Sequence, residues 1–307
     1  MDLLEQTKNL CKLYHIIPAR SKGQNFLIKE ETYDEVVAAA ELKSDETVLE
    51  VGPGLGFLTV KLSAQAGKVV AVELDDKLVA VLKTGLLAKG IKNVEVVNGD
   101  ILKIPLTPFI KGEEIGKTSL TLLLKEGFKV VANLPYNITS IFLRKYLEVE
   151  HKPKLMVLML QKEVAERITA KPGQMSLLAV SVQFYAQAEI IKIVSKENFW
   201  PQPEVDSAIV KITPRSNPLL LKERELNPPS SPFVKGGSKE KEFFRLVKFG
   251  FIAKRKMLKN NLAAGFKIDQ TEAASRIKQA GFNEKIRAQE LSVNDWLKLL
   301  ALFKESS

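Results

Sequence analysis

The sequence is short of the residues that build disulfide frameworks and metal sites. Its 307 residues include one cysteine, Cys11, and two histidines, His15 and His151, which have no potential ligands beside them in the sequence. A single cysteine excludes an internal disulfide, and isolated histidines do not predict a metal centre. We therefore expect a protein without a metal that works in a reducing, cytoplasmic compartment.

Long apolar runs are missing as well. The longest uninterrupted one, residues 155–160, is far too short to cross a bilayer. Residues 1–5 lack the basic start and the apolar core of a signal peptide. We expect no membrane association, while the 45% of hydrophobic residues suffices for one large or two modest domains with a real core.

Positive charge is in excess. The formal net charge of +10 and the pI of about 9.4 indicate a polyanionic partner, although a merely basic protein has the same composition. The charge is concentrated in residues 241–262, where seven cations accompany one acid, Glu242. These cations are Lys241, Arg245, Lys248, Lys254, Arg255, Lys256 and Lys259.

Between residues 47 and 161, short apolar runs alternate with amphipathic segments, as strands and helices do in βαβ units. The predicted strands are 47–51, 69–73, 94–98, 128–132 and 154–160, and the predicted helices are 56–66, 75–89 and a segment from Thr139. Helices at 163–169 and 176–185 then precede an antiparallel closing pair of strands at 189–194 and 206–213. We predict an α/β fold with a doubly wound, mostly parallel sheet.

The composition changes after this sheet. Residues 216–240 are rich in Pro, Ser, Gly and charge, which is typical of a linker or an exposed loop. Beyond them only helical periodicity remains, with capping boxes at 269–272 and 292–295. The predicted organisation is a Rossmann-like domain over 1–214, a linker or inserted loop over 215–240, and a small helical domain over 241–307.

A glycine-rich motif closes the first predicted strand and opens a helix. In residues 50–56 (EVGPGLG) the glycines permit a tight turn and let a ligand lie against the backbone. Glu73 ends the next strand, where an acid can accept hydrogen bonds from ribose hydroxyls. These features also fit a dinucleotide-binding dehydrogenase. The G-x-G-x-G spacing and the lack of an evident acid–base residue for hydride transfer argue against it.

Two further strand ends carry polar residues. The carboxylate of Asp100 can accept a bond from an adenine amino group, although a turn aspartate is the simpler interpretation in isolation. Asn133 offers a neutral oxygen to an amine, Pro135 fixes the backbone, and Tyr136 offers a flat face for a base. An ordinary Asn-Pro turn is the alternative for this tetrapeptide. Together the strand ends indicate S-adenosylmethionine bound across the sheet, with a nucleobase amine opposite its methyl group.

With these motifs the chain resembles the ribosomal RNA adenine N6-dimethyltransferase family, in particular its small-subunit members, from about residue 17 to residue 303. Gly-Gln-Asn-Phe-Leu at 23–27 and Asn-Leu-Pro-Tyr at 133–136 are the most specific match. The resemblance also covers 50–56, Glu73, Gly99-Asp100, 160–164, 199–203, 205–208 and 255–262. Lys22, where the family usually has an apolar or aromatic residue, and insertions around 105–127 and 216–240 depart from the pattern.

The resemblance implies roles for individual residues. S-adenosylmethionine would be surrounded by Asn25, Leu27, Gly52, Glu73, Asp100 and Asn133. The target base would meet a catalytic group made of Asn133, Leu134, Pro135, Tyr136 and Phe199. From the residues alone, Asn25 and Leu27 fit the entry to a helix at Glu30, and Phe199 fits a core aromatic.

The basic residues would then contact RNA. We expect Lys254, Arg255, Lys256 and Lys259 to bind the phosphate backbone, aided by Arg20, Lys22 and Lys29 near the site entrance, with a solvated helix face as the alternative. The implied activity is N6,N6-dimethylation of two adjacent adenosines near the 3′ end of 16S rRNA, by a monomer acting on a 30S assembly intermediate. A macrolide-resistance type of large-subunit methyltransferase and a non-catalytic RNA-binding assembly factor are alternatives. Leu134 and the 255–262 stretch favour the small-subunit enzyme, and intact Asn133 and Tyr136 disfavour the non-catalytic factor.

Overall fold

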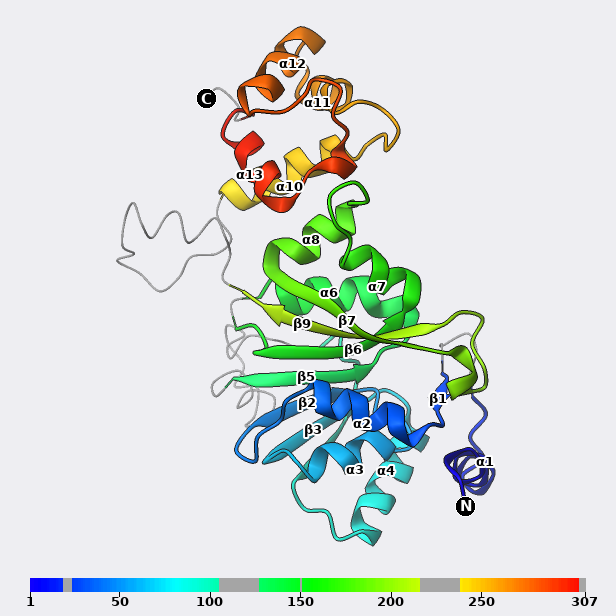
Figure 1. Cartoon of the computed structure of the whole chain (residues 1–307). Coiled ribbons are helices and arrows are strands. Elements are labelled where there is room, and N and C mark those ends of the chain that lie inside the picture. The colour runs from blue at the N-terminus through cyan, green and yellow to red at the C-terminus, as the bar shows by residue number, and fades with distance from the viewer. Residues whose placement is uncertain (19–23, 105–126, 150, 216–237, 304–307) are drawn as a thin grey trace, which may run out of the picture. The chain divides into compact units, whose positions relative to one another are not determined.

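A computed structural model describes residues 1–18, 24–104, 127–149, 151–215 and 238–303 (Figure 1). The two predicted insertions therefore lie largely outside the described residues. Described helix resumes at Ser238, slightly before the predicted end of the linker at 240.

The chain divides into two compact units. One comprises Met1–Ala165 with Ala188–Pro214, and the other comprises Glu166–Gln187 with Arg215–Ser307. The division after residue 214 coincides with the predicted domain boundary. Residues 166–187 differ from the prediction, because the structure groups them with the C-terminal helices and not with the sheet.

A seven-stranded sheet in the order β4-β3-β2-β5-β6-β9-β7 organises the first unit. The strands are β2 (Thr47–Val51), β3 (Lys68–Glu73), β4 (Val94–Asn98), β5 (Phe128–Asn133), β6 (Leu155–Gln161), β7 (Ala186–Val194) and β9 (Ser207–Pro214). The strands from β4 to β6 pair in parallel and β9 pairs antiparallel to β6. This confirms the predicted α/β fold. Because the chain leaves β4 and continues at β5, on the other side of β2, the sheet has its topological switch point between β2 and β5.

Burial follows this order. The central strands β5 and β6 are apolar and almost wholly buried, as strands covered on both faces should be. The helices of this unit are α1 (Leu3–Leu13), α2 (Glu30–Ala39), α3 (Phe57–Ser63), α4 (Asp76–Ala88), η2 (Tyr136–Ile138), α6 (Thr139–Leu147), η3 (Lys196–Asn198) and the first part of α7 (Lys162–Ile168). Apolar side chains of α2 and α3 form one core cluster with β2, β5 and β6. Figure 1 shows α2 and α3 in front of the sheet and α6 behind it.

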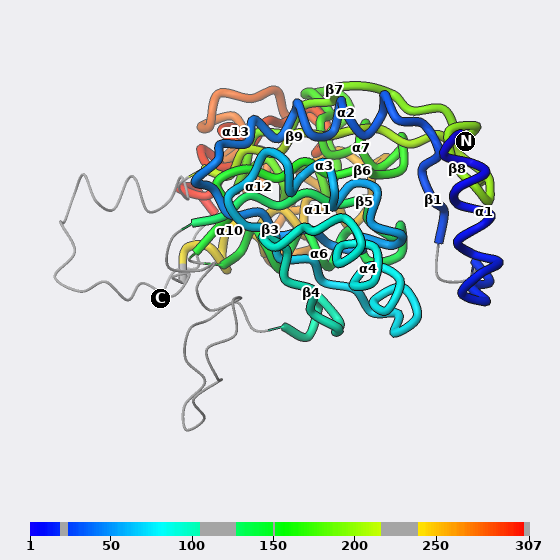
Figure 2. The backbone as a smooth tube through the Cα atoms, turned by 90° about the horizontal axis from the view of Figure 1, so that it is seen from below, coloured from blue at the N-terminus to red at the C-terminus, as the bar shows by residue number. Residues whose placement is uncertain are grey.

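A second, two-stranded sheet lies at one end of this unit. It joins β1 (Phe26–Leu27) to β8 (Phe199–Trp200) in antiparallel register, with Leu27 opposite Phe199. Helix α1 lies beside it (Figure 2), and its Cys11 belongs to a cluster that Phe26 and Trp200 pack against. Neither short strand was predicted. The pairing brings two motifs that are far apart in the sequence into direct contact.

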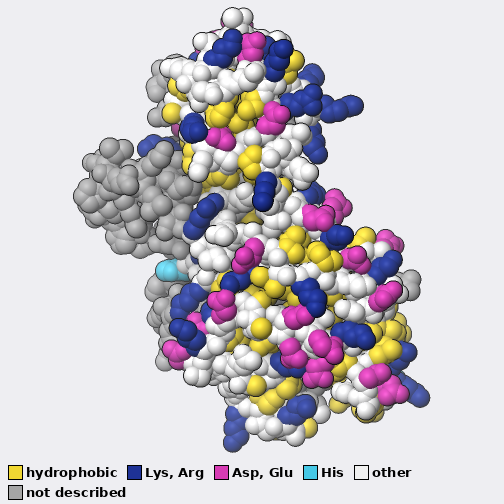
Figure 3. Space-filling model, in the orientation of Figure 1, with side chains coloured by type: hydrophobic (Ala, Val, Ile, Leu, Met, Phe, Trp, Pro, Cys, Tyr) yellow, Lys and Arg dark blue, Asp and Glu magenta, His cyan; other side chains and the backbone are white. Residues whose placement is uncertain are grey.

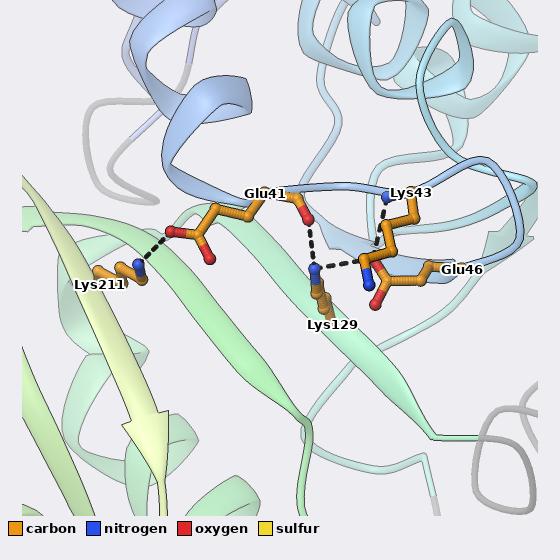
Figure 4. A network of polar contacts seen from close by, with 5 residues as sticks. All are labelled: Glu41, Lys43, Glu46, Lys129 and Lys211. Carbon is orange, nitrogen blue, oxygen red and sulfur yellow. Dashed lines mark hydrogen bonds and ion pairs between the residues drawn. The ribbon is translucent and has the colours of Figure 1, made fainter.

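A polar network ties the opposite end of β5 to neighbouring segments (Figure 4). Lys129, only 8% exposed, pairs with the Glu46 carboxylate at 2.7 Å and donates to the Glu41 carbonyl at 2.6 Å. The Glu41 carboxylate pairs with Lys211 on β9. Lys129 is the second residue of the strand that Asn133 ends, so the network holds β5 at the end away from the polar motif.

The second unit is helical. Its helices are α8 (Leu177–Tyr185), α10 (Ser238–Gly250), α11 (Leu258–Phe266), α12 (Gln270–Gln279), η4 (Ala288–Glu290) and α13 (Val293–Leu300). Phe243 and Val247 of α10 and Trp296 of α13 are fully buried, which agrees with the helical periodicity predicted for this region. Ser292 and Asp295 form the predicted capping box of α13. Asp269 caps α12 through its carboxylate, but the Glu272 side chain pairs with Arg276 instead of closing a box.

Candidate active site

A cavity opens at the carboxyl ends of β2, β3 and β5, beside the switch point of the sheet. Parallel α/β sheets bind their ligands at this position. It brings together nine of the predicted site residues, namely Asn25, Leu27, Gly52, Glu73, Asn133, Leu134, Pro135, Tyr136 and Phe199. Residues from five separate stretches of the sequence thus line one cavity.

The glycine motif lines one wall of this cavity. Gly52, Gly54 and Gly56 have φ of +67°, +59° and +86°, a region that residues with a Cβ rarely adopt. A Cβ on Gly54 would lie 3.4 Å from the ring of Phe26, so the ring already covers this part of the turn. The three glycines are required by backbone conformation, which is why the motif could be recognised from the sequence.

Glu73 secures the glycine turn and still offers a free acceptor site. Its Oε2 accepts from the amide of Gly54 at 3.1 Å, and its Oε1 accepts from the amides of Leu74 and Asp75 at 2.9 and 3.0 Å. Burial raises the pKa of this carboxyl, and the three amides oppose the shift. A carboxylate has about four lone-pair positions, so three amide bonds leave room for a ribose hydroxyl.

Glu50 is a second acid in the cavity wall. It is 1% exposed, and burial raises the pKa of its carboxyl to about 8, with the charge of Glu73 contributing. The Thr59 hydroxyl lies close enough to oppose the shift, but no hydrogen bond within the described residues joins it to either carboxylate oxygen. The free chain therefore holds a neutral, unpartnered acid beside the glycine turn.

The segment with Asn25 and Leu27 leads into helix α2 through the short strand β1. The hydroxyl of Tyr33 donates to the Leu27 carbonyl at 2.9 Å, and Ile28 donates to the Asn198 carbonyl at 2.8 Å. Helix α2 begins at Glu30, as predicted. The segment is thus an entry to this helix, and pairing with β8 extends its backbone before the helix starts. Contact of Asn25 and Leu27 with a cofactor stays a prediction.

The orientation of Asn133 is set by the same segment. Its Nδ2 donates to the carbonyl oxygen of Asn25 at 3.4 Å. With its nitrogen directed there, the side chain has its Oδ1 left to accept a hydrogen bond from a ligand. A Cβ on Gly52 would lie 3.8 Å from the Asn133 carbonyl, so the polar motif and the glycine turn are immediate neighbours.

The two aromatic residues predicted to meet the target base, Tyr136 and Phe199, are among the aromatic residues that line this cavity. Burial raises the pKa of Tyr136, whose hydroxyl shares a 2.9 Å hydrogen bond with the hydroxyl of Ser207 on β9. Phe199 is 3% exposed and belongs to the core cluster with α2 and α3. It is therefore a core aromatic that also forms part of the cavity wall, and its contact with a target base stays a prediction.

Asp100 is the one predicted cofactor residue that does not line the described cavity. Its carboxylate accepts from the Leu102 amide at 2.9 Å, and the turn that follows is held by Lys145, which donates to the carbonyls of Ile101, Leu102 and Ile104. Burial lowers the pKa of Lys145, and the charge of Asp100 opposes that shift. Contact between Asp100 and a cofactor stays a prediction.

The predicted RNA-binding cations lie in the second unit. Lys254, Arg255 and Lys256 are exposed in the segment between α10 and α11, and Lys259 is partly exposed. Figure 3 shows Lys and Arg side chains gathered along the side where that segment runs. Arg245 differs from the prediction, because it lies over the Phe266 ring at 5.5 Å and is only partly exposed.

A buried asparagine of α11 binds the backbone just before the basic segment. The side-chain amide of Asn261, 3% exposed, donates to the carbonyls of Gly250 and Ala253 at 2.6 and 3.1 Å. Of the cations expected near the site entrance, Lys29 is exposed, whereas Arg20 and Lys22 lie outside the described residues.

Three contributing residues were not predicted individually. Glu50 carried a signal, since an acid within the apolar run 47–51 indicates a buried charge. Tyr33 and Ser207 carried no such signal, because their hydrogen bonds, to the Leu27 carbonyl and to the Tyr136 hydroxyl, form only once the chain has folded. Among the described residues, no cluster of His, Cys, Asp and Glu could hold a metal ion, and no helix has the length and apolarity needed to cross a membrane.

The cavity fits S-adenosylmethionine. The glycine turn leaves room against the backbone, Glu73 has a free acceptor position for a ribose, and the Asn133 oxygen is available beside the turn. Fold and cavity together define a Rossmann-like, S-adenosylmethionine-dependent methyltransferase.

Comparison with known proteins specifies the family. A family model described as ribosomal RNA adenine dimethylase matches residues 19–305, and the chain belongs to that family. Among curated relatives, a ribosomal RNA small subunit methyltransferase A from Dehalococcoides mccartyi is 39% identical over 305 residues, covering 99% of this chain and 95% of the relative. Another from Enterococcus faecalis is 36% identical over 299 residues, covering 96% and 93%. The predicted family is confirmed.

Solved structures agree on the fold. The 23S rRNA methyltransferase ErmE has a TM-score of 0.68 at 27% identity, covering 91% of this chain and 99% of its own. A dimethyladenosine transferase from Plasmodium falciparum has a TM-score of 0.67 at 28% identity, covering 91% and 97%.

Proposed function

We propose that this protein dimethylates N6 of two adjacent adenosines near the 3′ end of small-subunit ribosomal RNA, with S-adenosylmethionine as the methyl donor. The observation that carries this proposal is the orientation of Asn133. Its amide nitrogen is engaged by Asn25, and its oxygen is left at the cavity beside the glycine turn. A neutral acceptor at this position suits an exocyclic amine, which has hydrogens to donate.

The chemistry required of the chain is positioning. The N6 lone pair of adenine is delocalised into the ring, so the free base is a poor nucleophile. Hydrogen bonds from N6 to the Asn133 Oδ1 and the Leu134 carbonyl would favour a tetrahedral nitrogen and direct its lone pair along one line. S-adenosylmethionine, when bound, supplies an electrophilic methyl group. No strong base is needed, because the methylated amine can release its proton to water.

The base would be held between aromatic faces. To reach the cavity an adenine must leave its stack, at a cost of a few kcal/mol, and stacking on aromatic side chains offsets about 1–3 kcal/mol per base. Tyr136 and Phe199 line the cavity with Asn133 and are the residues we assign to this role. The second methyl transfer starts with one N6 hydrogen fewer, so stacking must then contribute a larger share of the positioning.

The RNA backbone would bind the basic segment. Lys254, Arg255 and Lys256 are exposed together on a segment that Asn261 holds in place, so little ordering is needed on binding. Lys259 follows on α11. We also assign the protein to the cytoplasm, as a monomer that acts on a 30S assembly intermediate.

The small-subunit substrate is favoured over the large-subunit one by the relatives. Those at 34–41% identity over nearly the full chain are named small-subunit enzymes, whereas the 23S rRNA methyltransferase is 27% identical. The fold alone does not separate the two, since the 23S enzyme has a TM-score of 0.68.

The test uses purified protein with S-adenosylmethionine and small or large subunits from cells that lack this enzyme. Primer extension stops at N6,N6-dimethyladenosine, so two adjacent stops near the 3′ end of the small-subunit RNA are expected. A protein carrying Asn133→Ala provides the matched control. Stops only in large-subunit RNA would assign the other substrate, and no methylation of either RNA would contradict the proposal.

A further inference from the structure

A side-chain hydrogen bond joins Tyr136 to β9, a strand whose residues do not line the described cavity. The Tyr136 hydroxyl lies 2.9 Å from the Ser207 hydroxyl, and Ser207 is fully buried at the start of β9. Tyr136 follows β5, whereas β9 is separated from β5 in the sheet by β6. The bond therefore joins the ring to a strand that is not its neighbour.

The residue before Ser207 holds the segment with the second aromatic. The Asp206 carboxylate accepts from the Lys196 amide at 3.1 Å, which secures the start of η3. Phe199 follows η3 directly and pairs with Leu27 through β8. The Asp206 carbonyl in turn accepts from the Lys162 amide at 3.0 Å, so this dipeptide is itself fixed at the end of β6.

We propose that the dipeptide Asp206-Ser207 positions both aromatic walls of the target-base site, Tyr136 through Ser207 and Phe199 through Asp206. Two adjacent residues where β9 begins then determine where each wall lies. This inference rests on the proposed function, because it assumes that the two rings hold an adenine. Both are positioning residues, since neither touches the base.

The consequence is greatest for the second methyl transfer. The unmethylated N6 has two hydrogens for two acceptors, whereas the monomethylated N6 has one. With one hydrogen bond given up, the orientation of the base depends more on the rings. A loosened Tyr136 should therefore slow the second transfer more than the first, and N6-monomethyladenosine should accumulate.

The first experiment compares Ser207→Ala, Tyr136→Phe and the double variant in single-turnover methylation of small subunits. Products are separated as mono- and dimethyladenosine by mass spectrometry. Tyr136→Phe keeps the ring and breaks the same bond from the other end. Each single variant should slow the second transfer about tenfold. A buried hydroxyl is left without a hydrogen-bond partner in each, and such a loss costs about 1–3 kcal/mol. The double variant should be no slower than either.

Three readouts separate positioning from a structural defect. S-adenosylhomocysteine affinity should stay close to that of the wild type, and the urea midpoint should fall to the same extent in Ser207→Ala and Tyr136→Phe, because both remove the same buried hydrogen bond. Ser181→Ala, which removes an exposed hydroxyl bonded to the Leu177 carbonyl, should leave the product ratio unchanged. Asp206→Ala should slow both transfers, and its effect should multiply with that of Ser207→Ala, because the two act on different rings.

The inference fails if wild-type protein dimethylates the RNA while Ser207→Ala keeps the same product ratio. It also fails if the effects of Ser207→Ala and Tyr136→Phe multiply, since independent effects exclude a shared bond. An Asp206→Ala variant with wild-type rates would overturn the part that concerns Phe199. If wild-type protein methylates no adenosine, the proposed function fails instead, so the two failures are distinguishable.

Discussion

Replacing Glu50 with glutamine should make the chain more stable, and increasingly so as the pH rises. In the fold the pKa of this carboxyl is about 8, against an ordinary value of 4.5. Between these two values the unfolded chain releases the proton and the folded chain keeps it, so wild-type stability falls with rising pH. Glu50→Gln carries no titrating proton and removes that fall.

The size of the effect follows from the two pKa values. Since one pKa unit is worth about 1.4 kcal/mol, the stability difference between Glu50→Gln and wild type should grow by about 4 kcal/mol between pH 5 and pH 9. Most of that growth should occur between pH 5 and pH 8, and the difference should level off above.

Urea unfolding followed by circular dichroism across this pH range measures the difference. Glu46→Gln is the matched control with the opposite sign. Although burial alone would raise it, the pKa of Glu46 is lowered by Lys129, so its contribution is present at neutral pH and lost as the pH falls. A Glu50→Gln difference that does not change with pH would show that Glu50 is ionised in the fold, and the desolvated cavity wall would be refuted.

Three further changes test other parts of the structure. Gly54→Ala should lower S-adenosylhomocysteine affinity measured by calorimetry and cost about 1–2 kcal/mol of stability at φ +59°, while Gly85→Ala, with open space around its Cβ, should do neither. Lys129→Met should lower the free energy of unfolding by about 1–3 kcal/mol, because it leaves the partly buried Glu46 carboxylate without its charged partner, and an unchanged urea midpoint would contradict this. Neutralising the exposed cations of the α10–α11 segment should weaken RNA binding and leave cofactor affinity unchanged. The slope of log affinity against log salt concentration should become shallower by about 0.7–0.9 for each phosphate that is no longer neutralised. An unaltered slope would show that these cations do not contact RNA phosphates. These cations are Lys254, Arg255 and Lys256.

Features with a local physical cause could be predicted from the sequence. The glycine turn requires positive φ at Gly52, Gly54 and Gly56, and only glycine adopts it without strain. The apolar runs of β5 and β6 indicated strands covered on both faces. Ser292 at the start of α13 was recognisable because its capping partner lies within one helical turn.

Features that depend on distant partners could not be predicted. The strands β1 and β8 have only two residues each, too few for any periodicity, and exist because Leu27 meets Phe199. Composition counts Arg245 among the cations of residues 241–262, but the packing of α10 on α11 puts it over Phe266. The hydrogen bond from Tyr136 to Ser207 likewise needs the sheet to be assembled before the two hydroxyls can meet.

Rapid-quench methylation by Asn133→Ala tests the central claim most directly, because that claim concerns one oxygen atom. The variant removes the Oδ1 that would accept from N6 and leaves the glycine turn and Glu73 in place. We predict that it folds and binds RNA near wild-type affinity, while the first methyl transfer at saturating S-adenosylmethionine slows by about 100-fold or more, as when other hydrogen bonds to a transition state are removed. A folded Asn133→Ala protein that dimethylates adenosine at the wild-type rate would contradict the account.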